Sequence, residues 1–257
     1  MLADVTPVIL TYNELPNIER TLARLSWARR IVVVDSYSDD GTVELLRAHP
    51  AVEVVQHGFE SFASQWNFAL QHVQTDWALT LDADYVCSEE LAAQMESRLR
   101  AGTAAGVEVP FVYCVFGKPL RGTLYPPRVV LFRRHQVRFT QEGHHQRTEV
   151  DGRVERLSAP IFHDDRKPLT AWLAAQQRYT REEAVKLGAA ARHELALVDR
   201  LRRHPFLVPA LTPAYCLIVK GLLFDGLAGW YYAGQRTYAE LLLSLRLLEL
   251  RLAARAL

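Results

Sequence analysis

Short, almost wholly apolar segments alternate with amphipathic segments in the N-terminal part of the chain. Residues 5–12 and 31–35 are nearly all apolar, a pattern typical of strands that are buried on both faces of a sheet. After each of them, apolar side chains recur at helical spacing, beginning near Asn13 and at Thr42. We therefore predict two successive β-α units, with Asn13 as the N-cap of the first helix.

The same alternation continues further along the chain. Residues 52–55 and 77–82 predict two more strands, and residues 61–73 predict the helix between them. A further helix is predicted to begin at Ser88, which precedes two glutamates. Strands that alternate with helices at this spacing form a mainly parallel sheet with helices on both faces.

The pattern changes after Gly106. Three β-like stretches follow, separated by turns that contain Gly or Pro: residues 107–116, 128–134 and 153–162. They predict a mixed sheet with long loops, whereas the chain from Pro168 onward is predicted to be helical. We expect an α/β catalytic domain over residues 1–165 and a helical region over residues 166–257 that contacts a membrane interface or forms an oligomer.

Composition is that of a globular protein, with 257 residues, 49% hydrophobic and 23% charged, which excludes disordered and fibrous classes. The net charge of +1 is unevenly distributed. Residues 1–165 hold 16 Lys and Arg against 22 Asp and Glu, whereas residues 166–257 hold 14 against 7. An acidic first part suits a metal or nucleotide site, and a basic, apolar second part suits an anionic surface. We expect no nucleic-acid partner.

The cysteines and the chain start favour a cytoplasmic protein. Cys87, Cys114 and Cys216 lack the spacing of a zinc or redox motif, so we expect reduced thiols. Residues 1–4 lack the basic start of a secretory signal. The most apolar stretch, residues 206–234, is interrupted by prolines and charges, which disfavours a membrane span but suits a membrane interface. The expected location is therefore peripheral, at the inner face of the cell membrane.

Asp82 and Asp84 stand at the end of a predicted buried strand, two positions apart, so both carboxylates point to the same side. Two like charges repel unless a cation lies between them. Mg²⁺ and Mn²⁺ take one or two protein carboxylates and complete their coordination with phosphate oxygens and water. The pair therefore predicts a divalent-metal and diphosphate site. His163 is a further candidate ligand, with a hydrogen-bonded structural histidine as the alternative.

Other polar side chains end the first two predicted strands. Asp35 follows the second strand, and Thr11, Tyr12 and Glu14 follow the first, where they could hold a nucleoside. The simpler interpretation of the first group is a helix cap. The chain contains neither a G-x-G-x-x-G nor a G-x-x-x-x-G-K-[ST] motif, which argues against dinucleotide oxidoreductases and P-loop enzymes.

In order and spacing, VILTYNE, IVVVDSYSDDGT and LTLDADY resemble the three signatures of family 2 glycosyltransferases, which have the GT-A nucleotide-sugar-binding fold. LYPPRVVLFRR, GHHQR, VDGRVERL, IFHDD and GLLFDGLAGW are similar to segments of bacterial lipopolysaccharide-core and exopolysaccharide sugar transferases. This resemblance implies inverting transfer of a sugar, in expectation UDP-linked, to a lipid-linked saccharide or polyprenol phosphate. It implies nucleoside contacts by Thr11, Tyr12, Glu14 and Asp35, a ribose-and-metal contact by Asp82, and metal coordination by Asp84.

A transferase of this kind also needs a base for the acceptor hydroxyl. Related sequences tend to carry His-Glu where this chain has His145-Gln146, and a glutamine cannot take up a proton at neutral pH. Glu142 is our first choice as the base, followed by His145 and then Asp164. Two alternatives remain, a sugar-nucleotide-binding scaffold without catalysis and a sugar nucleotidyltransferase, although the basic glycine-rich phosphate loop of the latter is missing after the first strand.

Overall fold

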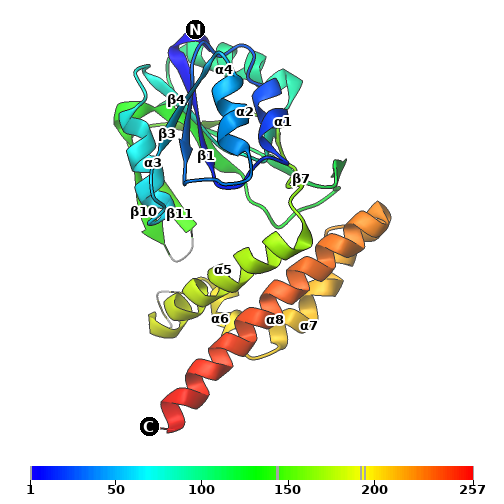
Figure 1. Cartoon of the computed structure of the whole chain (residues 1–257). Helices are drawn as coiled ribbons and strands as arrows, with labels where there is room; N and C mark the ends of the chain where they lie inside the picture. The colour runs from blue at the N-terminus through cyan, green and yellow to red at the C-terminus, as the bar shows by residue number, and fades with distance from the viewer. Residues whose placement is uncertain (1, 143–144, 192, 194, 257) are drawn as a thin grey trace. The chain divides into compact units, whose positions relative to one another are not determined.

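The computed structural model describes residues 2–142, 145–191, 193 and 195–256 of the chain (Figure 1). Contacts divide the chain into two compact units. The first unit comprises Met1–Pro119 and Leu124–Arg166, and the second comprises Leu120–Thr123 and Lys167–Leu257. Four residues from within the sequence of the first unit therefore belong to the second.

Seven strands form the main sheet of the first unit: β1 (Val5–Thr11), β2 (Ile31–Asp35), β3 (Val52–Gln56), β4 (Trp77–Asp82), β6 (Gly106–Val109), β9 (Arg128–Arg133) and β12 (Val154–Arg156). Their order is β12-β6-β9-β4-β1-β2-β3. Strands β1 to β4 run parallel, and β9 is antiparallel to both of its neighbours. This arrangement confirms the predicted mixed, mainly parallel sheet.

Two smaller sheets complete the first unit. One has the order β5-β13-β7-β8 and consists of β5 (Tyr85–Cys87), β7 (Phe111–Val115), β8 (Lys118–Pro119) and β13 (Ile161–His163). The other is an antiparallel pair of β10 (Val137–Glu142) and β11 (His145–Val150), in which Glu142 lies opposite His145. Short 3-10 helices, η1 (Leu2–Asp4) and η2 (Arg134–Gln136), lie at the chain start and before β10.

Helices cover both faces of the main sheet (Figure 1). On one side lie α1 (Ile18–Ala23), α2 (Thr42–Ala48) and α4 (Glu89–Ala101), and on the other lies α3 (Phe62–Gln71) with the β10-β11 pair. Alternate residues of each central strand enter opposite cores, as Val33 does with the first set and Val32 with the second. The strands lack a polar face because both faces are buried.

The first helix does not begin at Asn13. Its first residue is Ile18, and Leu15, expected on its buried face, is exposed. Asn13 instead adopts a left-handed φ of 53° and exchanges hydrogen bonds with Asp39. The predicted cap was wrong because the asparagine side chain bonds to a loop distant in sequence rather than to its own helix.

The second unit is helical. Its elements are α5 (Leu169–Ala189), α6 (Leu197–Arg202), α7 (Leu207–Ala214), the π-helical turn η3 (Tyr215–Val219), the 3-10 turn η4 (Leu222–Asp225) and α8 (Leu227–Ala256). A core containing Leu187, Leu243 and Leu247 joins α5 to α8. Arg202 of α6 donates two hydrogen bonds to Glu240 of α8, at 2.6 and 3.1 Å. Within the described residues, no helix is long and apolar enough to cross a membrane.

Replacing Gly229 with alanine is expected to destabilise the second unit. A Cβ there would lie 1.9 Å from the carbonyl oxygen of Leu222, a backbone atom that cannot move aside cheaply. We expect a loss of about 3 kcal/mol or more in the free energy of unfolding, measured by denaturant titration. Gly234 is the matched control, since it lies on the same helix with open space around its Cβ position. Gly234→Ala should raise stability by about 0.5–1 kcal/mol through helix propensity, and equal effects of the two changes would contradict the packing argument.

Candidate active site

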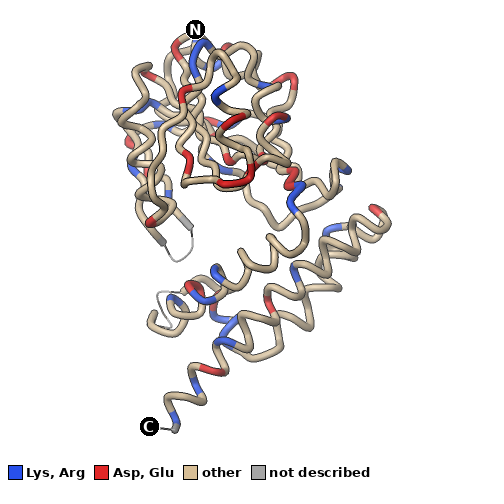
Figure 2. The backbone as a smooth tube through the Cα atoms, in the orientation of Figure 1, with Lys and Arg blue, Asp and Glu red and all other residues tan. Residues whose placement is uncertain are grey.

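The carboxyl ends of three neighbouring parallel strands meet at one edge of the main sheet. Thr11 of β1 pairs in register with Asp35 of β2, and Leu10 pairs with Asp82 of β4. The sheet thus brings together the polar strand ends selected from the sequence. Figure 2 shows acidic residues gathered along this edge, which is where ligands collect in open α/β sheets.

The loops that follow β1 and β2 are interlocked by hydrogen bonds. The Asn13 amide donates to Asp39 at 2.9 Å, and the Asp39 backbone N–H donates back to the Asn13 side chain at 3.0 Å. The backbone N–H of Glu14 donates to Thr42, and that of Leu15 donates to Asp40. These bonds fix both loops at the sheet edge before any ligand arrives.

Asp35 is fully buried and orders the second of these loops. One of its carboxylate oxygens accepts from the backbone N–H of Ser38 at 2.9 Å. The other accepts from the Thr11 hydroxyl at 3.0 Å and the Ser38 hydroxyl at 2.5 Å. These bonds give Asp35 a structural role, and its contact with a nucleoside stays a prediction.

Two aromatic rings stand exposed on the interlocked loops. Tyr12, a predicted nucleoside contact, is exposed, and so is Tyr37, which has a left-handed φ of 61°. Glu14 is half-buried, and its carboxylate accepts a hydrogen bond of 2.8 Å from the Asn17 amide. Sequence reasoning missed Tyr37 because it treated residues 36–41 only as a polar turn.

The segment Asp82-Ala83-Asp84, here called the acidic triplet, is held in place by hydrogen bonds to its backbone carbonyls. Thr21 of α1 donates its hydroxyl to the carbonyl oxygen of Ala83 at 2.7 Å, and the N–H of Asp164 donates to the carbonyl of Asp84 at 3.0 Å. Burial and the neighbouring charge of Asp84 together raise the pKa of Asp82. The two carboxylates therefore repel each other, although Asp84 lies in the turn after β4 and not on the predicted strand.

His163 faces the second carboxylate of the triplet. Its Nε2 lies 3.0 Å from an oxygen of Asp84, and its backbone pairs with Tyr85 across β13 and β5. Burial alone would lower the pKa of His163, but the charge and hydrogen bond of Asp84 raise it. Its Nδ1 is buried and, within the described part of the chain, has no hydrogen-bond partner. His163 is thus a close partner of the Asp84 carboxylate and can orient it.

An aromatic cluster with one guanidinium group surrounds the other carboxylate. The Tyr85 hydroxyl bonds to Asp82 and to the Tyr125 hydroxyl, and burial raises the pKa of both tyrosines. The guanidinium carbon of Arg128 lies 4.5 Å from the centre of the Tyr125 ring. The sequence gave no signal for the two tyrosines, which β5 and the loop before β9 bring together.

The carboxylate pair fits a divalent cation that completes its coordination with ligand oxygens. Asp82 and Asp84 supply the hard oxygen ligands that Mg²⁺ and Mn²⁺ prefer, and a cation would relieve the repulsion that raises the pKa of Asp82. Among residues 2–142, 145–191, 193 and 195–256, no three His, Cys, Asp or Glu side chains form a ready metal cluster. A third ligand from His163 therefore stays a prediction.

The predicted acceptor residues Glu142 and His145 are the last residue of β10 and the first residue of β11. The structure describes the backbone of Glu142 and His145, which face each other in register. Their side chains and residues 143–144 lie outside what the structure describes. The choice between Glu142 and His145 as the base therefore stays a prediction.

Asp164 is poorly suited to be a base. Its carboxylate accepts bonds from Arg166 Nε at 2.9 Å, from Arg20 at 3.0 Å and from the Gly117 N–H at 2.9 Å. Burial would raise its pKa, but the Arg166 and Gly117 hydrogen bonds and the charges of both arginines outweigh burial and lower it. The structure thus argues against the third choice made from the sequence, because both carboxylate oxygens already accept hydrogen bonds and a lowered pKa disfavours proton uptake.

Asp164→Asn is expected to lower the free energy of unfolding while having little effect on the rate of the reaction. Since its arginine partners are 30% and 35% exposed, we expect a loss of about 2–3 kcal/mol, below the range for fully buried pairs. A lowered pKa gives stability that is present at neutral pH and disappears as the pH falls through that pKa. Denaturant titrations at pH 7 and in acid should show the difference from wild type shrinking. A rate loss above about 10² at unchanged stability would restore Asp164 as a base.

Comparison with solved structures defines the class of this fold. The S. aureus TarS fragment 1–349, solved in complex with UDP-GlcNAc, matches with a TM-score of 0.53 at 13% identity, over 92% of this chain and 90% of the TarS chain. At that identity the likeness concerns the fold alone, which is of the GT-A type. The family model described as Glycosyl transferase family 2 matches residues 6–152. The chain belongs to glycosyl transferase family 2.

Curated relatives match this chain over only part of their own length. An uncharacterized glycosyltransferase of Rickettsia bellii is 34% identical over 93 residues, which make up 36% of this chain and 31% of the relative. The SPbeta prophage-derived glycosyltransferase SunS of Bacillus subtilis is 30% identical over 89 residues, 34% of this chain and 21% of SunS. The chain thus covers less than a third of either relative.

Proposed function

We propose that this chain is an inverting glycosyltransferase that uses a nucleoside diphosphate sugar as donor. The observation that carries the proposal is the carboxylate pair of Asp82, which ends β4, and Asp84, which lies in the following turn, beside the interlocked loops after β1 and β2. Membership of family 2 supports the reaction class. A UDP-linked donor is supported by the UDP-GlcNAc found with TarS, whose fold is similar.

The donor half of the reaction is assigned to the sheet edge. Thr11, Tyr12, Glu14 and Asp35 bind the nucleoside, with the exposed Tyr12 ring available to stack on the base. Asp82 and Asp84 would hold Mg²⁺ or Mn²⁺, which would supply Lewis acidity to the departing diphosphate. His163 keeps the Asp84 carboxylate in place through its 3.0 Å contact. Arg128 adds a fixed positive charge beside the leaving diphosphate.

The acceptor half is assigned to the β10-β11 end. Glu142 takes the proton of the acceptor hydroxyl while the hydroxyl oxygen attacks the anomeric carbon of the donor sugar. The diphosphate leaves from the opposite face of that carbon, so the configuration inverts. His145, directly opposite in register, is the second choice. The proposed acceptor is a lipid-linked saccharide or polyprenol phosphate of cell-envelope glycan synthesis, including lipopolysaccharide, which gives the enzyme a peripheral position at the cytoplasmic membrane face.

A panel of nucleotide sugars, incubated with the protein and Mn²⁺ or Mg²⁺, tests this function. Slow donor hydrolysis with release of nucleoside diphosphate, for one donor well above the others, is the expected result. Release of pyrophosphate in the presence of nucleoside triphosphate and sugar phosphate would identify a nucleotidyltransferase instead. Donor binding without turnover, with or without lipid-linked acceptors, would favour a scaffold protein, a possibility that Gln146 keeps open.

A further inference from the structure

The segment that joins α7 to α8 exposes large apolar side chains. Leu227 is 89% exposed, Ile218 74% and Phe224 72%, and Leu211 and Trp230 are each more than half exposed. Single exposed apolar residues are ordinary, but a group of them on packed neighbouring elements marks an interaction site. We call residues 211–230 the hairpin surface.

Close backbone contacts and a buried hydrogen bond hold the hairpin surface in place. The buried Asp225 carboxylate accepts a hydrogen bond of 2.9 Å from the backbone N–H of Arg121. Gly122 lies so close to Lys220 that a Cβ would be 2.6 Å from its carbonyl oxygen, and a Cβ at Gly229 would meet the backbone of η4. Close backbone contacts thus fix the turns that present the apolar side chains.

Lys and Arg outnumber Asp and Glu around the hairpin surface. Residues 203–239 contain three basic residues and a single acid, Asp225. That acid is 4% exposed, and its carboxylate lies 3.3 Å from Arg121 Nε. Figure 2 shows few charged residues in this stretch of the second unit. An apolar surface with basic residues and no exposed carboxylate suits anionic lipid head groups.

Basic and aromatic side chains are paired on this surface. Lys220 Nζ lies 5.6 Å from the centre of the Tyr215 ring, and the guanidinium carbon of Arg121 lies 5.8 Å from that of Phe224. Tyrosine, tryptophan and basic residues are favoured at membrane interfaces because each has an apolar body and a polar end. This composition favours a lipid surface over a purely apolar protein partner.

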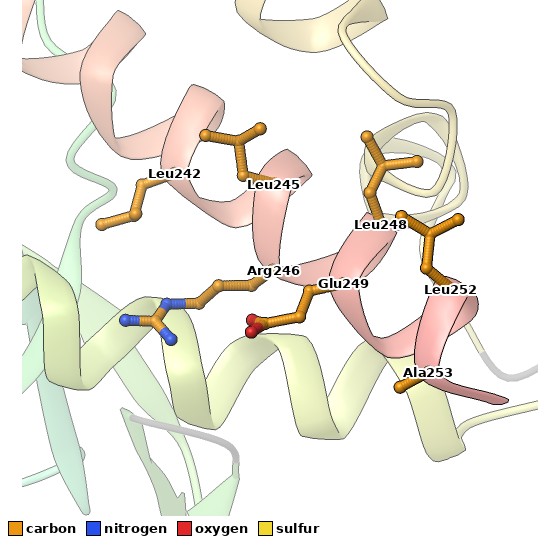
Figure 3. Close-up of a pocket in the computed structure, with 7 residues that line it drawn as sticks. All are labelled: Leu242, Leu245, Arg246, Leu248, Glu249, Leu252 and Ala253. Carbon is orange, nitrogen blue, oxygen red and sulfur yellow. The ribbon is translucent and has the colours of Figure 1, made fainter. Parts of the chain in front are cut away.

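A second apolar face, on α8, is less suited to the same role. Figure 3 shows Leu245, Leu248 and Leu252 around a hollow that Arg246 and Glu249 also line. Arg246 is committed to α5, where its Nε donates to a threonine hydroxyl at 3.0 Å. Glu249 then places a carboxylate where anionic head groups would be repelled. This face provides a matched control for the first.

We propose that the hairpin surface docks the protein onto an anionic lipid bilayer. The inserted groups are the side chains of Ile218, Phe224, Leu227 and Trp230, with Lys220 and Arg121 at head-group level. This docking rests on the proposed function in one respect, since the proposed lipid-linked acceptor lies at such a bilayer. No described helix can cross the membrane, so the contact is peripheral.

Flotation with vesicles tests the docking directly. The full chain is mixed with phosphatidylcholine vesicles containing either no anionic lipid or about a third of phosphatidylglycerol. Wild type is expected to float with the anionic vesicles, more at low salt than at high salt. Phe224→Ser/Leu227→Ser should weaken binding by about tenfold or more, because two large apolar contacts are lost. Leu245→Ser/Leu252→Ser, two exposed changes on the α8 face, should bind like wild type.

Two further measurements keep the outcomes distinct. Brominated lipid should quench wild-type tryptophan fluorescence, and Trp230→Phe should remove that quenching while vesicle binding persists. Circular dichroism and donor hydrolysis without lipid should match wild type in every variant, which excludes misfolding.

If wild type hydrolyses donor but does not float with anionic vesicles, the docking proposal alone is overturned. Loss of flotation in the α8 control but not in the hairpin variant also overturns it. So does a dimer that wild type forms without lipid and the hairpin variant does not form, if neither protein binds vesicles. Flotation without any donor turnover overturns only the proposed function.

Discussion

Replacing Asp84 with asparagine is expected to reduce donor hydrolysis and sugar transfer by about 10²–10³-fold. The change removes the carboxylate that follows β4 in the turn and that, with Asp82, would hold the proposed divalent ion. Losing about 3–4 kcal/mol of stabilisation of the departing diphosphate corresponds to that factor. Initial rates at saturating donor, with Mn²⁺ titrated from zero, measure it.

Thermal shift separates this effect from a folding defect. Donor together with Mn²⁺ should raise the melting temperature of wild type but not of Asp84→Asn, because a ligand stabilises only the state that binds it. Glu96→Gln, an exposed change on α4, serves as the control and should keep both the rate and the shift. A donor shift that is indifferent to Mn²⁺ and to Asp84 would overturn the metal assignment.

Glu142→Gln is expected to lower transfer to the acceptor by about 10²–10⁴-fold while donor binding stays intact. A glutamine keeps the size of the side chain but cannot take the proton from the acceptor hydroxyl, and losing a general base typically costs this factor. The measurement is the rate of acceptor-dependent release of nucleoside diphosphate, with the donor-induced thermal shift recorded on the same samples.

Glu149→Gln is the matched control for this prediction, since Glu149 lies on β11 of the same strand pair and is exposed. It should transfer at the wild-type rate. If Glu142→Gln retains near-normal turnover, the assignment of Glu142 fails and His145→Gln becomes the decisive variant. A loss confined to His145→Gln would assign the proton transfer to the imidazole.

The sheet could be predicted because its signals are local. Runs such as residues 31–34 are apolar throughout, and such runs form strands buried on both faces whatever lies elsewhere in the chain. A residue that directly follows such a strand lies at the carboxyl edge. This reasoning placed Asp35 and Asp82 at the same edge, as the register of β1, β2 and β4 confirms.

The side-chain network at that edge could not be predicted, because its partners are far apart in sequence and follow no period. Asn13 and Asp39 are separated by 26 positions, and Tyr85 and Tyr125 by 40. Local preference pointed instead to Asn13 as a helix cap. The same holds for Asp164, which looks like a free loop carboxylate in the sequence until Arg20, from 144 positions away, pairs with it.

The position of Leu120–Thr123 in the sequence affects the order in which the parts of the chain fold during synthesis. It leaves the ribosome long before its partner Asp225, which lies 104 positions later in the chain. Domains generally fold from the N-terminus during synthesis, yet these four residues must wait, with Leu120 unburied, until the second unit is nearly complete. A nascent chain stalled near residue 200 should therefore expose this segment to protease, and release of the full chain should protect it.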